Sequence, residues 1–208
     1  MLKYVVMKKC LLFVIVLPFL SFGQSSEEYK WGAGLHLGDP TGIIITRYLN
    51  YESSLDLNIG SSPSLTDRYE NYYSDRFYDW YLNQNTNWND YQYLGHDVSN
   101  LTLQLRYKKH KQINDIDGLT WYYGIGAQFR QQTISYDYRY RNYDNIWITV
   151  NDDKEKTYDF GVDALIGLEY IIPNSPIAIF LDINTFVEIV DDPFRLWLQG
   201  GLGAKYCF

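Results

Sequence analysis

The feature that most constrains the fold of this chain is an alternation of apolar and polar side chains with a period of two residues. From Leu119 to Phe129 the odd-numbered residues are apolar or aromatic, whereas the even-numbered residues are small or carry a polar group. A similar division recurs over residues 158–171, 177–189 and 195–208. Successive side chains of a β-strand point to opposite faces, so the pattern predicts four strands with one apolar face each.

Four segments nearer the N-terminus alternate less strictly but are compatible with strands, namely residues 29–38, 42–50, 53–60 and 101–108. Tight turns are predicted at residues 39–42 and 173–176, where proline and glycine favour a reversal. Two connections are long, residues 61–96 and 131–157, and both fall on the side opposite the termini, as the long extracellular loops of membrane barrels do. The sequence therefore predicts an all-β fold, an eight-stranded antiparallel up-and-down transmembrane β-barrel.

The first 23 residues have the features of a secretory signal peptide. Lys3, Lys8 and Lys9 precede an apolar run over residues 10–22, and small residues around Gly23 suit cleavage before Gln24. The apolar run is shorter than the roughly 20 residues that a spanning helix needs. We therefore expect a signal peptide over residues 1–23 and a mature barrel over residues 24–208.

Charge and cysteine content exclude several classes of function. The signal segment holds three of the 18 basic residues and none of the 25 acidic ones, which leaves 15 bases against 25 acids and a formal net charge of −10. A nucleic-acid partner would require a basic surface, so none is expected. After cleavage Cys207 is the one remaining cysteine, which excludes an intramolecular disulfide and a thiolate zinc site. The histidines are far apart in the predicted barrel, and no cofactor or metal is expected.

The placement of aromatic and charged residues indicates which face of the barrel points outward. Rings near strand ends form girdles at the two membrane interfaces, and the lumen of an eight-stranded barrel is narrow enough for paired charges to fill it. We therefore expect the apolar face to meet lipid and the charged face to line the lumen. The predicted outward rings are Trp31, Tyr48, Tyr107, Trp121, Phe129, Tyr158, Tyr170, Tyr206 and Phe208. The predicted inward charges are Lys30, Arg47, Arg106, Lys108, Arg130, Arg195, Lys205, Asp56, Asp159, Asp163, Glu169, Asp182 and Glu188.

Three short motifs carry a resemblance to a known group. These are the Phe-Gly-Gln at residues 22–24, the segment from Trp31-Gly-Ala-Gly to Gly38-Asp-Pro-Thr-Gly, and the closing Gly-Gly-Leu-Gly-Ala-Lys-Tyr-Cys-Phe that ends at Phe208. The chain resembles small outer-membrane β-barrel proteins of the Bacteroidota, which are similar in architecture to the OmpA-barrel and OmpX group. The resemblance implies a location in the bacterial outer membrane, and recognition of the terminal Phe208 by the barrel-assembly machinery.

The sequence contains little that suggests catalysis. His96, with Asp97 and Ser99 nearby, is the one set of residues that could supply the histidine, carboxylate and serine of a lipid-modifying barrel enzyme, and a polar strand end is the favoured interpretation. Glycine pairs such as Gly124 and Gly126 lie inside predicted strands and open no helix, so they do not indicate nucleotide binding. We expect no enzyme; a lipid-modifying enzyme and a narrow pore are the alternatives.

The two long connections are unusually rich in tyrosine, tryptophan, asparagine and aspartate. Tyrosine supplies rigid contact area with a polar tip, which is typical of binding surfaces. The favoured function is therefore an interaction or structural component of the cell envelope, whose partner is outer-membrane lipopolysaccharide, a surface glycan or a protein of an envelope complex. The alternative for part of each loop is a hairpin extension with tyrosines packed across strands. The candidate partner-binding residues are Tyr72, Tyr73, Phe77, Tyr78, Trp80, Tyr81, Trp88, Tyr138, Tyr140, Tyr143 and Trp147.

Overall fold

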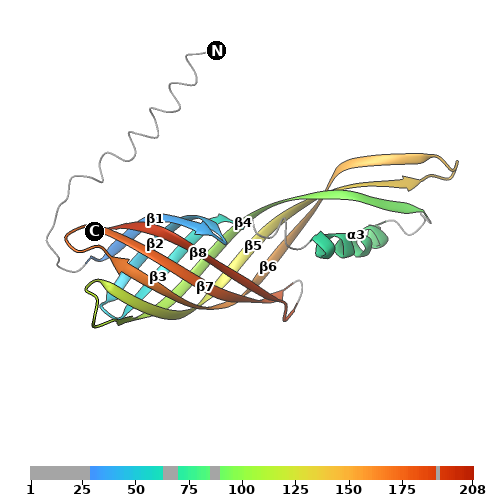
Figure 1. The fold of residues 1–208 in the computed structure, drawn as a ribbon. Helices are drawn as coiled ribbons and strands as arrows, with labels where there is room; N and C mark the ends of the chain where they lie inside the picture. The colour runs from blue at the N-terminus through green and yellow to red at the C-terminus, as the bar shows by residue number, and fades with distance from the viewer. Residues whose placement is uncertain (1–28, 63–69, 85–89, 191–192) are drawn as a thin grey trace, which may run out of the picture.

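The fold is a closed antiparallel β-barrel with an extension at one end (Figure 1). The computed structural model describes residues 29–62, 70–84, 90–190 and 193–208. Each strand pairs with the next along the chain, and β8 pairs with β1. The predicted fold class, an eight-stranded up-and-down barrel, is confirmed. The elements are β1 (Trp31–Gly38), β2 (Thr41–Asn50), β3 (Ser53–Ser61), α3 (Glu70–Gln84), β4 (Tyr91–Gln112), β5 (Leu119–Arg141), β6 (Trp147–Ile171), β7 (Ile177–Val190) and β8 (Leu196–Cys207).

An apolar belt surrounds the outside of the barrel. Its side chains are well exposed, for example Leu103 at 42%, Ile125 at 68% and Leu181 at 51%. Aromatic side chains at strand ends, among them Tyr107 and Tyr158, are exposed on the same surface. An unbroken apolar circumference of this kind suits lipid rather than water, so the barrel spans a membrane with its strands. Among the described residues, no helix has the length and apolar character needed to cross a membrane.

The lumen is filled by paired charges, amides and rings. Arg106 Nε lies 2.8 Å from Asp163 Oδ2, and Lys108 Nζ lies 2.6 Å from Asp56 Oδ2. All four side chains are buried. The predicted inward position of these charges is therefore correct. They fill the lumen as pairs, because a charge is tolerated in a buried site when an opposite charge lies beside it.

Two residues of β2 face the opposite way from the prediction. Arg47 is exposed and its guanidinium lies 5.1 Å from the centre of the Trp31 ring, whereas Tyr48 points inward and donates a hydrogen bond to Glu169 Oε1 (2.7 Å). The error arises because residues 43–45 are three consecutive isoleucines, which hide the alternation. Lys30, also predicted inward, is exposed at the rim.

The strands differ greatly in length, which gives the barrel one tall side. β4, β5 and β6 have 22, 23 and 25 residues, whereas the others have 8 to 14. Figure 1 shows the three long strands continuing beyond the barrel, with α3 beside them. The predicted loop 131–157 is instead mostly the upper part of the β5–β6 hairpin, and the described part of 61–96 contains α3 and the start of β4. The hairpin alternative is thus correct for most of the second loop, and α3 was not predicted.

Candidate functional site

The extension is a small folded unit, which we call the head. It consists of residues 91–100 of β4, 131–141 of β5, 147–157 of β6, and α3 (Figure 1). It lies at the end of the barrel opposite Phe208, whose backbone pairs with that of Trp31. Membrane barrels place their short turns on one side and their longer loops on the extracellular side, so we expect the head on the extracellular side.

One face of α3 packs against the inner face of the three strands. Tyr73, Phe77 and Tyr81 recur every four residues, which places them on one side of a helix, and all three are fully buried. The Phe77 ring lies 5.3 Å from that of Tyr136 and 5.4 Å from that of Tyr138, both on β5. Ring separations in this range are favourable for aromatic pairs. The head therefore has an aromatic core of its own.

Tyrosine hydroxyls and an ion pair fix α3 to the strands. Tyr73 donates to Gln132 Oε1 (3.0 Å), and Arg76 Nη2 lies 3.2 Å from Glu155 Oε1. Glu155 also accepts a hydrogen bond from Tyr136 (3.2 Å). Burial raises the pKa of Tyr73 to about 12. The Tyr73 hydroxyl therefore stays protonated and acts as a hydrogen-bond donor rather than as a titrating group.

Most of the candidate partner-binding residues lie in this core. Tyr73, Phe77, Tyr81 and Tyr138 are buried, so a partner cannot contact them directly, and Trp80 and Tyr140 are partly buried. Their abundance in the sequence reflects packing. The exposed candidates are Tyr78 (39%), Tyr143 (81%) and Trp147 (40%), for which partner binding stays a prediction. Trp88 and the side chain of Tyr72 lie outside the described residues.

The tip of the β5–β6 hairpin carries the exposed candidates together with residues that the sequence analysis missed. The guanidinium carbons of Arg139 and Arg141 lie 4.9 Å and 5.0 Å from the centre of the Trp147 ring. The period-2 pattern could have found this cluster, because residues 133–141 continue the alternation of β5 with arginines opposite tyrosines.

The histidine considered for catalysis has a packing role. The His96 ring lies 4.8 Å from that of Tyr73, and His96 Nδ1 is hydrogen-bonded to the hydroxyl of Tyr93. Asp97 and Ser99 alternate with His96 along β4 and are exposed on the other face. The three residues therefore do not converge. Across the part of the chain that the structure describes, no three histidine, cysteine or acidic side chains are grouped as a metal site requires.

A second serine–histidine pair lies inside the barrel near its periplasmic end. Ser54 Oγ lies 2.8 Å from His110 Nε2, a distance that nucleophilic catalysis requires. Ser54 is fully buried, however. Since a substrate would have to reach the hydroxyl, the pair is suited to holding β3 against β4 and not to catalysis.

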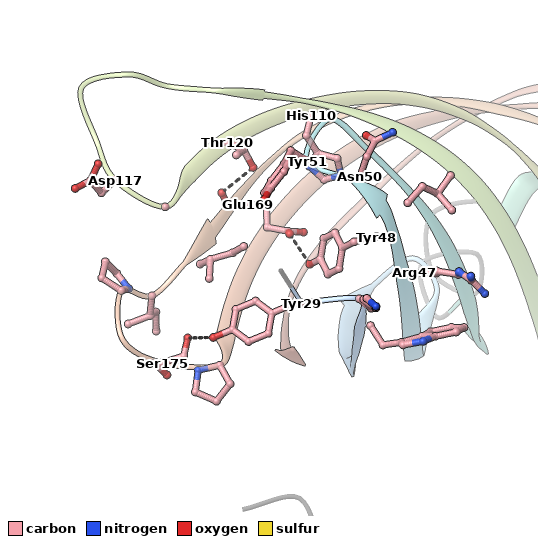
Figure 2. Close-up of a pocket in the computed structure, with 18 of the residues that line it drawn as sticks. Tyr29, Arg47, Tyr48, Asn50, Tyr51, His110, Asp117, Thr120, Glu169 and Ser175 are labelled. Carbon is pink, nitrogen blue, oxygen red and sulfur yellow. Dashed lines mark hydrogen bonds between the residues drawn. The ribbon is translucent and has the colours of Figure 1, made fainter. Parts of the chain in front are cut away.

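The periplasmic mouth of the barrel forms a pocket of about 930 Å³ (Figure 2). The Tyr29 hydroxyl donates to the carbonyl of Ser175 (3.3 Å) across this mouth. At its floor Glu169 accepts a hydrogen bond from Tyr48 and lies 2.6 Å from Lys205 Nζ. The charge of Glu169 is thus already compensated within the barrel, and the pocket ends on a closed polar floor.

Comparison with known proteins shows a likeness of fold. No protein-family model matches the sequence, and no curated protein sequence matches it. The structure is similar to the N-terminal β-barrel domain of OprF from Pseudomonas aeruginosa, with 15% identity, 86% of this chain and 95% of that chain covered, and a TM-score of 0.51. Weaker likenesses are to CarO2 of Acinetobacter baumannii (11% identity, 86% and 98% covered, TM-score 0.48) and to Ail, the attachment invasion locus protein of Yersinia pestis (10% identity, 86% and 93% covered, TM-score 0.42).

The OprF domain shares the closed eight-stranded fold, and the apolar belt of the present barrel is the surface that such a fold presents to lipid. The chain is an eight-stranded β-barrel of the bacterial outer membrane. At these identities the comparisons establish the fold and not the activity.

Proposed function

We propose that this protein is a non-enzymatic interaction component of the cell envelope, in which the barrel anchors the head and the tip of the head contacts a partner. The observation that carries the proposal is the composition of the tip. Tyr143, Ile146 and Trp147 are 81%, 59% and 40% exposed at the end of a well-packed hairpin. Exposed aromatic and apolar groups gathered at one place are typical of binding surfaces.

The construction of the head supports this proposal because it fixes the tip before a partner arrives. The Asn142 side-chain oxygen accepts hydrogen bonds from the backbone of Asp144 (3.0 Å) and Ile146 (2.9 Å), which holds the turn in one shape. The α3 core stiffens the strands below it. A surface that is already ordered loses less conformational entropy on binding.

Neither alternative has comparable support. A pore requires an open lumen, and here Arg106, Lys108 and their acidic partners occupy it together with large rings such as Trp197. A lipid-modifying enzyme requires an accessible nucleophile beside its base, and His96 is packed against Tyr73.

The route to the outer membrane is also a proposal. Residues 1–23 lie outside the described residues, and the signal peptide stays a prediction based on their sequence. Phe208 is 51% exposed at the end of the last strand, a position at which the barrel-assembly machinery could contact it. The Bacteroidota origin likewise rests on the short motifs around Trp31 and Phe208.

The proposal is tested by shortening the hairpin. Tyr138 and Val150 are paired residues, so residues 139–149 can be replaced by Asn-Gly, which favours a two-residue hairpin turn. The α3 contacts of Tyr138 are retained. We expect the barrel to assemble and to lose the partner that copurifies with the full chain in mild detergent.

The exposed side chain of Asp75 on α3 supplies the control, since Asp75→Asn changes the head away from the tip. The proposal fails if the shortened protein retains every partner of the full chain.

A further inference from the structure

The outer face of the hairpin tip holds an aromatic ring beside two cations. Arg141 and Trp147 are directly paired across the strands, and Arg139 lies two residues before Arg141 on the same face. Their guanidinium carbons are 5.0 Å and 4.9 Å from the centre of the ring, while Trp147 keeps 40% of its surface exposed. The indole is therefore held in place by the arginines, and part of it stays open to a ligand.

Both arginines are held by neighbouring residues, Arg139 by Gln92 of β4 and Arg141 by Asp90, which directly precedes β4. Arg139 donates from Nε and Nη2 to Gln92 Oε1, at 2.8 Å and 2.5 Å. Arg141 Nη1 lies 3.4 Å from Asp90 Oδ2, and the two residues also share a backbone hydrogen bond of 2.9 Å. The planar guanidinium groups are thus ordered in the absence of a ligand, which reduces the entropy lost on binding.

Arg139 carries a charge that its neighbours on β4 leave uncompensated. Its side-chain hydrogen bonds go to the neutral amide of Gln92, so this contact does not cancel its positive charge. A guanidinium binds a carboxylate, phosphate or sulfate group through parallel hydrogen bonds. The cluster therefore combines a flat apolar surface with a donor group for an oxyanion.

The height of the cluster above the membrane indicates whether its ligand is a lipid headgroup or a longer sugar chain. Gln131 pairs with Tyr158 at the upper aromatic level, and Arg141 lies ten positions further along β5. At about 3.4 Å per residue this is roughly 34 Å along the strand, or about 25 Å of height at the tilt of a barrel strand. The tip thus stands beyond the phosphates of the outer leaflet and among the polysaccharides that surround a cell.

We infer that the outer face of the tip binds an anionic polysaccharide. A sugar ring packs against the part of the Trp147 side chain that the arginines leave exposed, and the acidic group of that sugar is bound by Arg139 with Arg141 beside it. The inference rests on the proposed function and names the class of ligand that the head recognises.

The test measures binding of three soluble polysaccharides to the purified full-length barrel in detergent. Alginate carries carboxylates, dextran sulfate carries sulfates and dextran is neutral. We expect alginate and dextran sulfate to bind and dextran not to bind. Trp147→Ala and Arg139→Gln should each weaken alginate binding by about tenfold or more, as the loss of a hydrogen bond to a charged group or of a stacked ring implies.

Lys154→Gln is the matched control. It removes one positive charge from the same face of the head, at a residue that is 54% exposed in its side chain and lies nearer the barrel. We expect it to leave alginate binding within about twofold of the unmodified protein, because its pairing partner Ser135 lies four positions from Arg139 and salt screens exposed charges at such a distance. Equal losses for Lys154→Gln and Arg139→Gln would mean that net charge alone attracts the polymer, and would overturn the inference.

A second arm identifies the source of the polysaccharide. Lipopolysaccharide from the producing cell is tested with its sugar chain intact and after removal of that chain. Binding of the intact form alone supports the site and points to the cell's own coat, whereas binding of alginate alone supports it and points to an external polymer. Binding that survives removal of the sugar chain would contradict the inference.

These outcomes separate the inference from the proposed function. If none of the polysaccharides binds but a protein partner is lost with Trp147→Ala, the ligand class is wrong and the interaction function stands. If changes at Trp147 and removal of residues 139–149 affect neither polysaccharide binding nor protein copurification, the inference and the proposed function both fail.

Discussion

Lys205 and Glu169 illustrate how single residues keep the lumen closed. Lys205 Nζ lies 2.6 Å from Glu169 Oε2 and donates to Thr46 Oγ1 (3.2 Å), while Tyr48 donates to the other oxygen of Glu169. Both charges are about 1% exposed. A buried charge is tolerated when it is paired and hydrogen-bonded, so each member of this cluster depends on the others.

The first prediction follows from that dependence. Lys205→Met leaves the Glu169 carboxylate buried without its cation, and we expect it to lower the free energy of unfolding by about 3–5 kcal/mol. Urea unfolding in detergent micelles measures the change. The double variant Lys205→Met, Glu169→Leu removes both charges and should be more stable than the single variant. A double variant as unstable as the single one would contradict the account.

At this scale the sequence allowed many side-chain directions to be predicted. Arg106, Lys108 and Asp163 were assigned to the lumen because their neighbours alternate strictly, and the structure places them there. Arg47 and Tyr48 were assigned to the wrong faces. The isoleucines of their strand follow one another without a polar residue between them, so the sequence pattern does not indicate which face of the strand is apolar.

At the scale of single elements, β5 passes through two environments without changing its period. In the barrel its outward residues, such as Ile125, are apolar and its inward residues, such as Gln128, are polar. Beyond Gln132 the polarity reverses, with Thr133 and Ser135 outward and Ile134 and Tyr136 packed beneath α3. The reversal occurs because lipid no longer covers the outer face and an aromatic core replaces the lumen.

The second prediction uses this reversal. Ile125→Arg places a charge near the middle of the lipid-facing part of β5, and we expect it to destabilise the barrel by about 2–4 kcal/mol. Thr133→Arg lies on the same face of the same strand above the belt, and should cost about 0–1 kcal/mol. Unfolding in lipid vesicles compares the two. Similar costs at both positions would place the edge of the bilayer elsewhere.

The elements of the head were the least predictable part of the fold. The four-residue spacing of Tyr73, Phe77 and Tyr81 is a helical signal. It was masked because polar residues surround it and the same residue types suit an exposed binding loop. In the strands, the inversion of polarity after Gln132 ended the expected pattern early, although the strand itself continues.

The third prediction concerns the packing of α3. Phe77→Ala removes a fully buried ring from the core of the head, and we expect a loss of about 3–5 kcal/mol in the local stability of α3. Hydrogen exchange of the α3 amides should accelerate, while the heat-modifiable migration of the barrel on gels is retained. Asp79→Asn changes an exposed side chain of the same helix and should have an effect within about 0.5 kcal/mol. Equal exchange rates in the two variants would show that α3 does not depend on this core.

The whole molecule combines a closed anchor with a head on one side. The three longest strands form one side of the barrel and continue into the head, so the anchor and the proposed binding surface are parts of the same strands (Figure 1). Within the described residues, β4, β5 and β6 each run from the barrel into the head as one continuous strand. This architecture suits a protein that holds a contact surface at a fixed height above the membrane.

The fourth prediction is that the whole barrel does not conduct. Ion pairs and rings such as Tyr122 and Phe186 fill the lumen, which leaves little room for hydrated ions. Planar-bilayer recordings of purified protein should therefore show no stable conductance, with a known porin added afterwards to show that the bilayer accepts channels. Discrete and reproducible current steps before that addition would support the pore alternative.

The most direct test of the account is whether the head faces the outside of the cell. Tyr143→Cys places a thiol at the exposed tip, and Asp115→Cys places one in the exposed turn at the opposite end of the barrel; the native Cys207 is 1% exposed and should not react. With a maleimide that does not cross the outer membrane, we predict labelling of the Tyr143→Cys protein in intact cells, and of the Asp115→Cys protein only after the membrane is permeabilised. Labelling of Asp115→Cys but not of Tyr143→Cys in intact cells would contradict the account.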